Sequence, residues 1–333
     1  MAAAGMVSAV QAGVVNVGSF TGEFVTVGDP GNSADTTGYG AVSETFDIMK
    51  FEFTNQQYVQ FLNSVDANGN KPNAIYNESM GSNARGGISF NSGNSAGNKY
   101  AVRTNMGNKP VNYVSWFDAA RVSNWLHNGA TSSSSTETGA YNLNNATSGN
   151  AVALTAGAKF FIPSENQWYK AAYYKGGGTS AGYWTYATQS NSAPTAVTAN
   201  STGDGSAGST GNRANYNSSA GWNGQTGNVT TVGTNGVSSA YGAFDMSGNV
   251  REWNDLDGNA GELRGLRGGA WDTNAVSVSR SGRTTTNPSN DPSFYGFRLA
   301  SVSSSAVVPE PSMMVIGTLF GLGGLVAKRR MKK

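Results

Sequence analysis

Glycine constrains this chain more than any other residue, because it fills 45 of the 333 positions, about twice its usual share of ~7 %. Charged residues make up only 13 %, against a usual ~25 %. Glycine in such numbers favours turns with left-handed backbone over long helices, whose interiors it destabilises. The chain is long enough to bury a large core. The composition therefore predicts a loop-rich domain with many turns. Together with the helices and strands predicted below, it indicates an α+β fold with few regular elements and long ordered loops.

The sequence contains no cysteine, and this removes whole classes of chemistry. Disulfides, thiolate nucleophiles, cysteine-ligated zinc and iron–sulfur clusters are excluded. The single histidine, His127, also excludes a metal site built from several histidines. It stands at the end of a predicted helix, where a cation stabilises the helix dipole, so we interpret it as structural.

Three helices are predicted from residues that cap helix N-termini. Thr54 precedes apolar residues that recur at helical spacing. Ser115 and Asp118 form a capping box that opens a second helix, and Ser164 with Gln167 opens a third.

Strands and loops are predicted from alternation and from polar composition. Short strands are expected over 14–27 and 45–53, where apolar and polar residues roughly alternate. The stretches 66–108, 129–158 and 175–212 are rich in Gly, Ser, Asn and Thr. Such lengths are uncommon in a compact domain. We expect short hairpins, ordered loops that bind something, or surface insertions there.

An uncharged apolar run over 313–327 is followed directly by a basic tail. The run predicts a hydrophobic helix about 22 Å long at 1.5 Å per residue, short for a membrane span. The positive-inside rule would leave the tail cytoplasmic and the rest of the chain outside. The last six residues carry five positive charges, so the net charge of +2 becomes 2 − 5 = −3 without them. A mildly acidic body predicts no nucleic-acid partner.

A Pro-Glu-Pro triplet, an apolar run and an arginine cluster follow one another in this order near the C-terminus. They resemble the PEP-CTERM sorting signal of Gram-negative bacteria. The resemblance implies export, an intermediate held in the inner membrane, recognition by an exosortase-type sorting machinery, and delivery to the cell surface or extracellular matrix. The residues that carry it are Pro309, Glu310, Pro311, Arg329 and Arg330.

Four segments are expected along the chain. Residues 1–12 are interpreted as a truncated signal peptide, with a disordered lead-in as the alternative. Residues 13–303 form the folded domain. Residues 304–312 are a linker that holds the Pro-Glu-Pro triplet, and 313–333 are the hydrophobic helix and basic tail.

A series of short motifs runs through almost the whole predicted domain. They are FEFTNQQY (51–58), PVNYVSW (110–116), IPSENQW (162–168), DMSGNVREW (245–253), RGGAW (267–271) and GFR (296–298). In this order they resemble the formylglycine-generating enzyme, or sulfatase-modifying factor, family, over about residues 15 to 301.

The resemblance implies a glycine-rich variant of the C-type lectin fold with structural calcium as a cofactor. Calcium takes six to eight oxygen ligands, mixing carboxylates with carbonyls, and a glycine inside the loop permits the sharp turn. The alternative is a turn in which the carboxylates accept backbone N–H groups without a metal. The implied ligands are Asp245, Gly248, Val250 and Glu252 at one site, and Asn215 and Tyr216 at a second.

The family's oxidase activity depends on two cysteines shortly after the RGG-x-W segment, which bind copper(I). Thr273 and Ala275 stand approximately where those thiols would be. Hydroxyls and methyl groups do not bind copper(I) as thiolates do. We therefore expect no copper cofactor and no formylglycine-generating oxidase activity.

The segment after RGGAW also resembles the variable receptor proteins of diversity-generating retroelements, which display this surface for binding. Residues 272–295 are rich in Ser, Thr, Asn and Arg, a composition suited to adaptable hydrogen bonding. The predicted ligand-binding surface comprises Asp272, Thr273, Asn274 and Ser277.

These observations lead to one function and two alternatives. The leading prediction is a non-catalytic, exported or cell-surface protein that binds a cell-surface polysaccharide or protein, or builds a matrix. One alternative is a formylglycine-generating-type or other enzyme, such as a hydrolase using Asp255 and Asp257. The other is a purely architectural surface component.

Several large side chains are interpreted as structural. Trp253 and Trp271 are expected to pack in the core beside glycine-rich turns. Arg267, Arg283 and Arg298 are expected to be internal donors to carboxylates or carbonyls, with the alternative that one of them faces a cleft.

Overall fold

The largest sheet joins the beginning and the end of the folded domain. The computed structural model describes residues 13–177 and 182–303. Every neighbouring pair of strands in this sheet is antiparallel, and Ile48 pairs with both Val25 and Ala300. In sheet order the strands are β1 (Gly13–Val17), β2 (Phe20–Val27), β3 (Phe46–Met49), β13 (Ala300–Val302) and β6 (Phe160–Phe161).

A second sheet carries the motifs of the C-terminal half. Its order is β11 (Thr284–Thr286), β10 (Arg264–Arg267), β9 (Arg251–Asn254) and β12 (Tyr295–Gly296), with only the last pair parallel. Two small two-stranded sheets complete the description. They pair β4 (Ile88–Phe90) with β5 (Tyr100–Val102), and β7 (Thr195–Ala196) with β8 (Arg213–Ala214).

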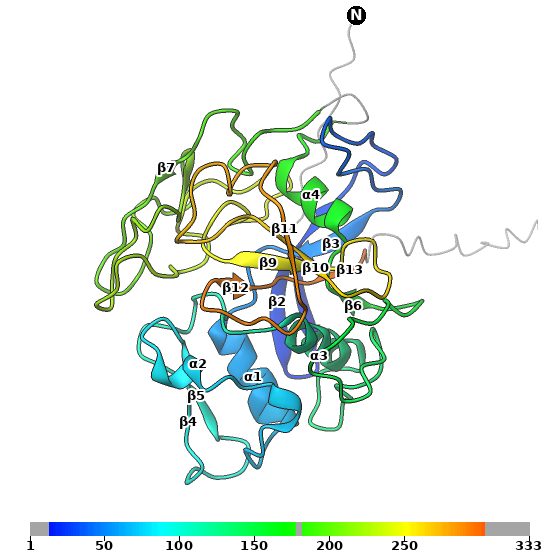
Figure 1. Ribbon diagram of the computed structural model, residues 1–333, viewed down its shortest axis with the longest axis vertical. Coiled ribbons are helices and arrows are strands. Elements are labelled where there is room, and N and C mark those ends of the chain that lie inside the picture. Colours follow the sequence, from blue (N-terminus) through cyan, green and yellow to red (C-terminus); the bar gives the residue numbers. More distant parts are fainter. Residues whose placement is uncertain (1–12, 178–181, 304–333) are drawn as a thin grey trace, which may run out of the picture.

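All three predicted helices are confirmed, and each begins with a capping box. They are α1 (Asn55–Val65), α3 (Trp116–His127) and α4 (Glu165–Tyr173), capped by Thr54, Ser115 and Ser164. Short helical turns occur at Pro72–Ala74 and at α2 (Ser79–Ser82). In Figure 1, α4 lies above the strands of the second sheet, and α1 and α3 lie below them.

The core between α1, α3 and the first sheet is built from aromatic rings. Phe53 stacks between Phe20 and Phe297, with ring centroids 5.8 and 5.0 Å apart, and Phe61 of α1 meets Trp125 of α3 edge-on at 5.5 Å. All five rings are fully buried. Such rings contribute large buried apolar areas, which a fold with so few regular elements requires.

In the described residues of the long polar stretches, short backbone ladders and side-chain hydrogen bonds both hold the chain in place. In the first, β4 and β5 form the expected hairpin. In the second, the buried amide of Asn124 donates to the carbonyls of Thr136 and Tyr141 at 2.8 and 2.9 Å. The predicted α+β domain with few helices and long ordered loops is thus confirmed, whereas the hydrophobic helix at 313–327 and the sorting signal lie outside the described residues. Within the part that is described, no helix combines the length and apolarity needed to cross a membrane.

His127 has a structural contact, as expected, but that contact is a hydrogen bond and not the helix dipole. It ends α3, but its Nδ1 atom accepts the backbone N–H of Lys159 at 3.0 Å. Partial burial and the nearby Lys159 charge lower the pKa of His127. It is therefore a neutral acceptor near pH 7, and the cation predicted to stabilise the helix dipole is absent.

The α3 cap makes stability depend on pH. The carboxylate of Asp118 accepts the N–H and hydroxyl of Ser115 at 2.8 and 2.7 Å, yet burial raises its pKa from 3.8 to about 6. A raised folded-state pKa gives stability that is present below pH 3.8 and is lost as the pH rises through 6. Relative to Asp118→Asn, the wild-type free energy of unfolding should fall by about 2–3 kcal/mol between pH 4 and 7 in urea titrations. Parallel curves for the two proteins would contradict this.

Candidate functional site

The loop between β10 and β11 forms one wall of a pocket of about 230 Å³. Gly268 and Gly269 turn the chain out of β10 with φ of +86° and +68°, and a Cβ at Gly269 would come within 2.7 Å of Val278. The hydroxyl of Thr273 then closes the turn against the N–H and carbonyl of Ala270, at 3.0 and 2.9 Å. The lining residues are Arg251, Leu266, Arg267, Gly269, Val276, Ser277, Ser281, Gly282, Arg283 and Thr284.

The four residues of the predicted ligand-binding surface differ in how exposed they are. Asp272 and Asn274 are exposed, whereas Thr273 and Ser277 are half-buried. Asn274 uses its side-chain oxygen to accept the N–H and hydroxyl of Ser277, at 3.0 and 3.2 Å. Of the four, Ser277 lines the pocket. The loop therefore presents a polar rim beside the pocket.

Two arginines of the pocket share one buried carboxylate at the start of α4. Glu165 accepts Nε of Arg267 at 2.8 Å, and it accepts Nε and Nη2 of Arg283 at 2.8 and 3.0 Å. The prediction that both arginines donate to carboxylates is confirmed, and both also line the pocket. Arg251 is the third cation of the lining, and sequence reasoning missed it. Its place directly before Glu252 in the DMSGNVREW motif was the available signal, since alternation along β9 puts the two side chains on opposite faces.

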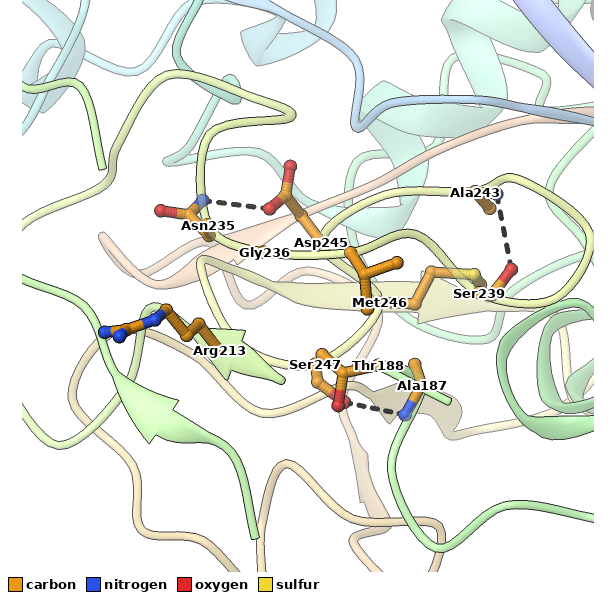
Figure 2. Close-up of a pocket in the computed structure, with 11 residues that line it drawn as sticks. Ala187, Thr188, Arg213, Asn235, Gly236, Ser239, Ala243, Asp245, Met246 and Ser247 are labelled. Atoms are coloured by element: carbon orange, nitrogen blue, oxygen red, sulfur yellow. Dashed lines mark hydrogen bonds between the residues drawn. The ribbon is translucent and has the colours of Figure 1, made fainter. Parts of the chain in front are cut away.

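The first implied calcium site is filled by hydrogen-bond donors. Figure 2 shows Asp245 directed toward Asn235, whose amide donates to Oδ1 at 2.9 Å, while Gly233 N–H donates to Oδ2 at 2.5 Å. The cavity beside Asp245 measures about 10 Å³, roughly the space of one water. Both Glu252 oxygens accept from Arg298, at 2.6 and 2.7 Å. In this arrangement the oxygens of Asp245 and Glu252 already accept hydrogen bonds, Asp245 in part from backbone as in the alternative and Glu252 from side chains. Calcium at Asp245, Gly248, Val250 and Glu252 stays a prediction.

Glu252 belongs to a buried charge cluster that includes a residue the sequence did not reveal. Glu52 is fully buried and accepts the Asn249 amide at 2.7 Å. Burial, and then the negative charges of Asp245 and Glu252, raise the pKa of Glu52 well above its usual value. In the sequence, the only indication that Glu52 is buried was its position between two phenylalanines in FEF (51–53).

The second implied calcium site retains one free ligand atom. Asn215 is fully buried, and its Oδ1 has no hydrogen-bond partner. The carbonyl of Tyr216 accepts the Ser219 hydroxyl at 2.9 Å. An orphaned buried oxygen suits a cation, but it supplies one of the six to eight ligands that calcium needs. Calcium at Asn215 and Tyr216 stays a prediction.

The carboxylate pair of the hydrolase alternative is not brought together in a pocket. Asp255 is buried and lies 2.7 Å from Nε of Arg264. Asp257 is exposed and accepts the N–H and amide of Asn259. One carboxylate is thus an internal ion-pair partner and the other a solvated turn residue, so this arrangement does not support general acid and base catalysis.

The tryptophan predictions are confirmed. Trp253 is fully buried and Trp271 is 7 % exposed. Trp253 donates to the carbonyl of Val114 at 3.0 Å. Both rings pack inside the domain, so neither offers a stacking face to a ligand.

Comparison with known proteins agrees with the sequence motifs. A model of the sulfatase-modifying factor enzyme 1-like domain matches residues 3–302. No curated protein matches the chain. Among solved structures, Treponema denticola variable protein 1 aligns with a TM-score of 0.52 at 20 % identity, covering 88 % of this chain and 99 % of that one. At this identity the likeness shows the fold alone.

Two further structures are similar over comparable lengths. CarF aligns with a TM-score of 0.49 at 20 % identity, covering 88 % of this chain and 97 % of that one. PvdO from Pseudomonas aeruginosa aligns with a TM-score of 0.46 at 17 % identity, covering 87 % and 98 %.

Proposed function

Because this chain belongs to the sulfatase-modifying factor enzyme 1-like family and yet contains no cysteine, we propose that it is a non-catalytic binding protein built on the family's scaffold. The observation that carries the proposal is a family match over residues 3–302 in a chain without cysteine, with Thr273 and Ala275 approximately where the resemblance would place the two thiols. Copper(I) requires soft ligands, and the chain offers no thiolate anywhere. The family's oxidase chemistry therefore has no metal centre.

The 268–284 loop is the surface we assign to ligand binding. It combines exposed polar groups at Asp272 and Asn274 with the adjoining pocket of about 230 Å³. Small-molecule sites are typically concave and combine a few polar groups with an apolar wall. Leu266 and Val276 supply the apolar part of this lining.

We further propose that the protein is exported to the cell surface or extracellular matrix of a Gram-negative bacterium. The support is the C-terminal sequence, in which Pro309, Glu310 and Pro311 precede an apolar run and the arginines at 329 and 330. The partners are then an exosortase-type machinery, the membrane before processing, and a cell-surface polysaccharide or protein. No nucleic acid is expected, because the body of the chain is mildly acidic.

Combined replacement of Thr273, Asn274 and Ser277 by alanine should weaken ligand binding about 10-fold or more, because Asn274 and Ser277 lose polar groups at the rim and Thr273 loses the hydroxyl that closes the turn. The measurement is titration of the full chain against arrayed cell-surface polysaccharides and proteins. The matched control replaces Ser92, Asn94 and Ser95, which are exposed in the β4–β5 turn, and should leave binding unchanged.

One result would contradict the assigned surface, and another would contradict the non-catalytic function. Equal binding by both triple variants would move the ligand away from the loop. An aldehyde formed on a cysteine-containing model peptide by purified protein would restore the enzyme alternative.

A further inference from the structure

The pocket beside the 268–284 loop carries an excess of positive charge. Its lining residues include Arg251, Arg267 and Arg283. Glu165 is the one carboxylate that pairs with any of them in the described part of the chain. Three arginines and one carboxylate give a net charge of two positive units beside a pocket of about 230 Å³. Such a wall attracts an anionic group.

The three arginines differ in what they have left to donate. Arg267 is 1 % exposed and is held by Glu165 and by the carbonyls of Arg280 and Gly282. The Arg283 side chain is 35 % exposed and uses Nε and Nη2 on Glu165, and its Nη1 donates to no atom of the described residues. The backbone N–H of Arg251 donates to the carbonyl of Phe294. Its side chain makes no hydrogen bond or ion pair within residues 13–177 and 182–303, and its guanidinium lies 5.8 Å from the Phe294 ring centre. All the N–H donors of the Arg251 guanidinium are therefore available to a carboxylate.

The rest of the lining suits a sugar ring. Ser277, Ser281 and Thr284 bring hydroxyl groups that hydrogen-bond to other hydroxyls, and Val276, which is 67 % exposed, brings an apolar edge for ring C–H groups. The pocket is below the usual range for drug-sized ligands. It matches one pyranose ring better than an extended peptide.

Resting on the proposed binding function, we propose that this pocket binds a uronic-acid residue of an acidic polysaccharide. The sugar carboxylate lies between Arg251 and Arg283, and its hydroxyls meet the serine and threonine side chains. Arg251 is then the specificity residue, because it is the only one of the three cations whose charge no carboxylate of the described chain offsets.

The test is calorimetric titration of the full chain with trigalacturonate and with its neutral methyl ester. The ester should bind about 10-fold more weakly or worse, because it keeps the rings and loses the charge. Arg251→Gln should weaken trigalacturonate binding to the same degree. Lys159→Gln removes the same charge from an exposed side chain outside this lining, and should leave the affinity within about twofold. Unchanged thermal unfolding of both variants confirms that they are folded.

Each other outcome overturns the assignment. Equal affinity for acid and ester, or equal effects of the two variants, would remove the anion site. Tri-aspartate binding as tightly as trigalacturonate would replace the sugar with an acidic protein segment. If array ligands depend on Thr273, Asn274 and Ser277 while trigalacturonate does not bind, the uronate assignment fails and the binding function stands.

Discussion

Replacing Arg298 with methionine is expected to lower the free energy of unfolding by about 3–5 kcal/mol, because it leaves a buried carboxylate without its counter-charge. Arg298 and Glu252 are both completely buried. The same guanidinium also donates to the carbonyls of Met49 and Phe244, at 3.1 and 2.7 Å. It therefore joins β3, β9 and the loop before the DMSGN turn, and methionine replaces none of these contacts.

The control for this prediction is Lys50→Met, which breaks an exposed ion pair with Glu23. This variant should lower the free energy of unfolding by about 0–1 kcal/mol. Urea unfolding of the full chain measures both variants. If Arg298→Met does not fold, adding Glu252→Leu should recover part of the lost stability, since it removes the stranded charge. Equal losses for the two methionine variants would show that the buried pair is not a major source of stability.

Local signals in the sequence were sufficient for the helices but not for the interior charges. Each helix could be predicted because its capping residue and the residue that completes the capping box lie three positions apart in the sequence. The capping residues are Thr54, Ser115 and Ser164. Glu52 and Asn249 bond to each other across 197 positions. No spacing rule connects such residues, so a charged residue that serves the core cannot be distinguished from a solvated one by pattern alone.

In the candidate site, too, the sequence revealed local features but not the contacts between residues distant in the chain. Arg267 and Arg283 were expected to donate to a carboxylate, but their common partner, Glu165, lies more than 100 positions earlier. The polar loop after RGGAW was visible as composition. The pocket behind it depends on β9, β10 and the loop meeting in space, and Arg251 becomes part of it only through strand pairing.

The turn that carries the implied calcium ligands is held by contact between two loops. Gly248 has φ of +99°, and a Cβ there would lie 2.2 Å from the carbonyl oxygen of Asn215. That same oxygen accepts the N–H of Asn249 at 2.8 Å. The two loops to which the resemblance assigns separate ions are therefore in close backbone contact, and the Asn215 amide also donates to Oδ1 of Asn249 at 3.1 Å. The missing side chain of Gly248 permits this approach.

Gly248→Ala should consequently lower the free energy of unfolding by about 3–5 kcal/mol, the sum of left-handed strain and overpacking against backbone that cannot move aside. Gly258→Ala is the matched control: its φ is +82°, but the nearest atom to the added Cβ is 3.9 Å away. Gly258→Ala introduces the left-handed strain but no overpacking, so its free energy of unfolding should fall by about 1 kcal/mol. Urea unfolding of both proteins, with and without added calcium, measures the difference. Equal losses would show that strain alone decides the effect and that the approach of Asn215 to Gly248 contributes nothing.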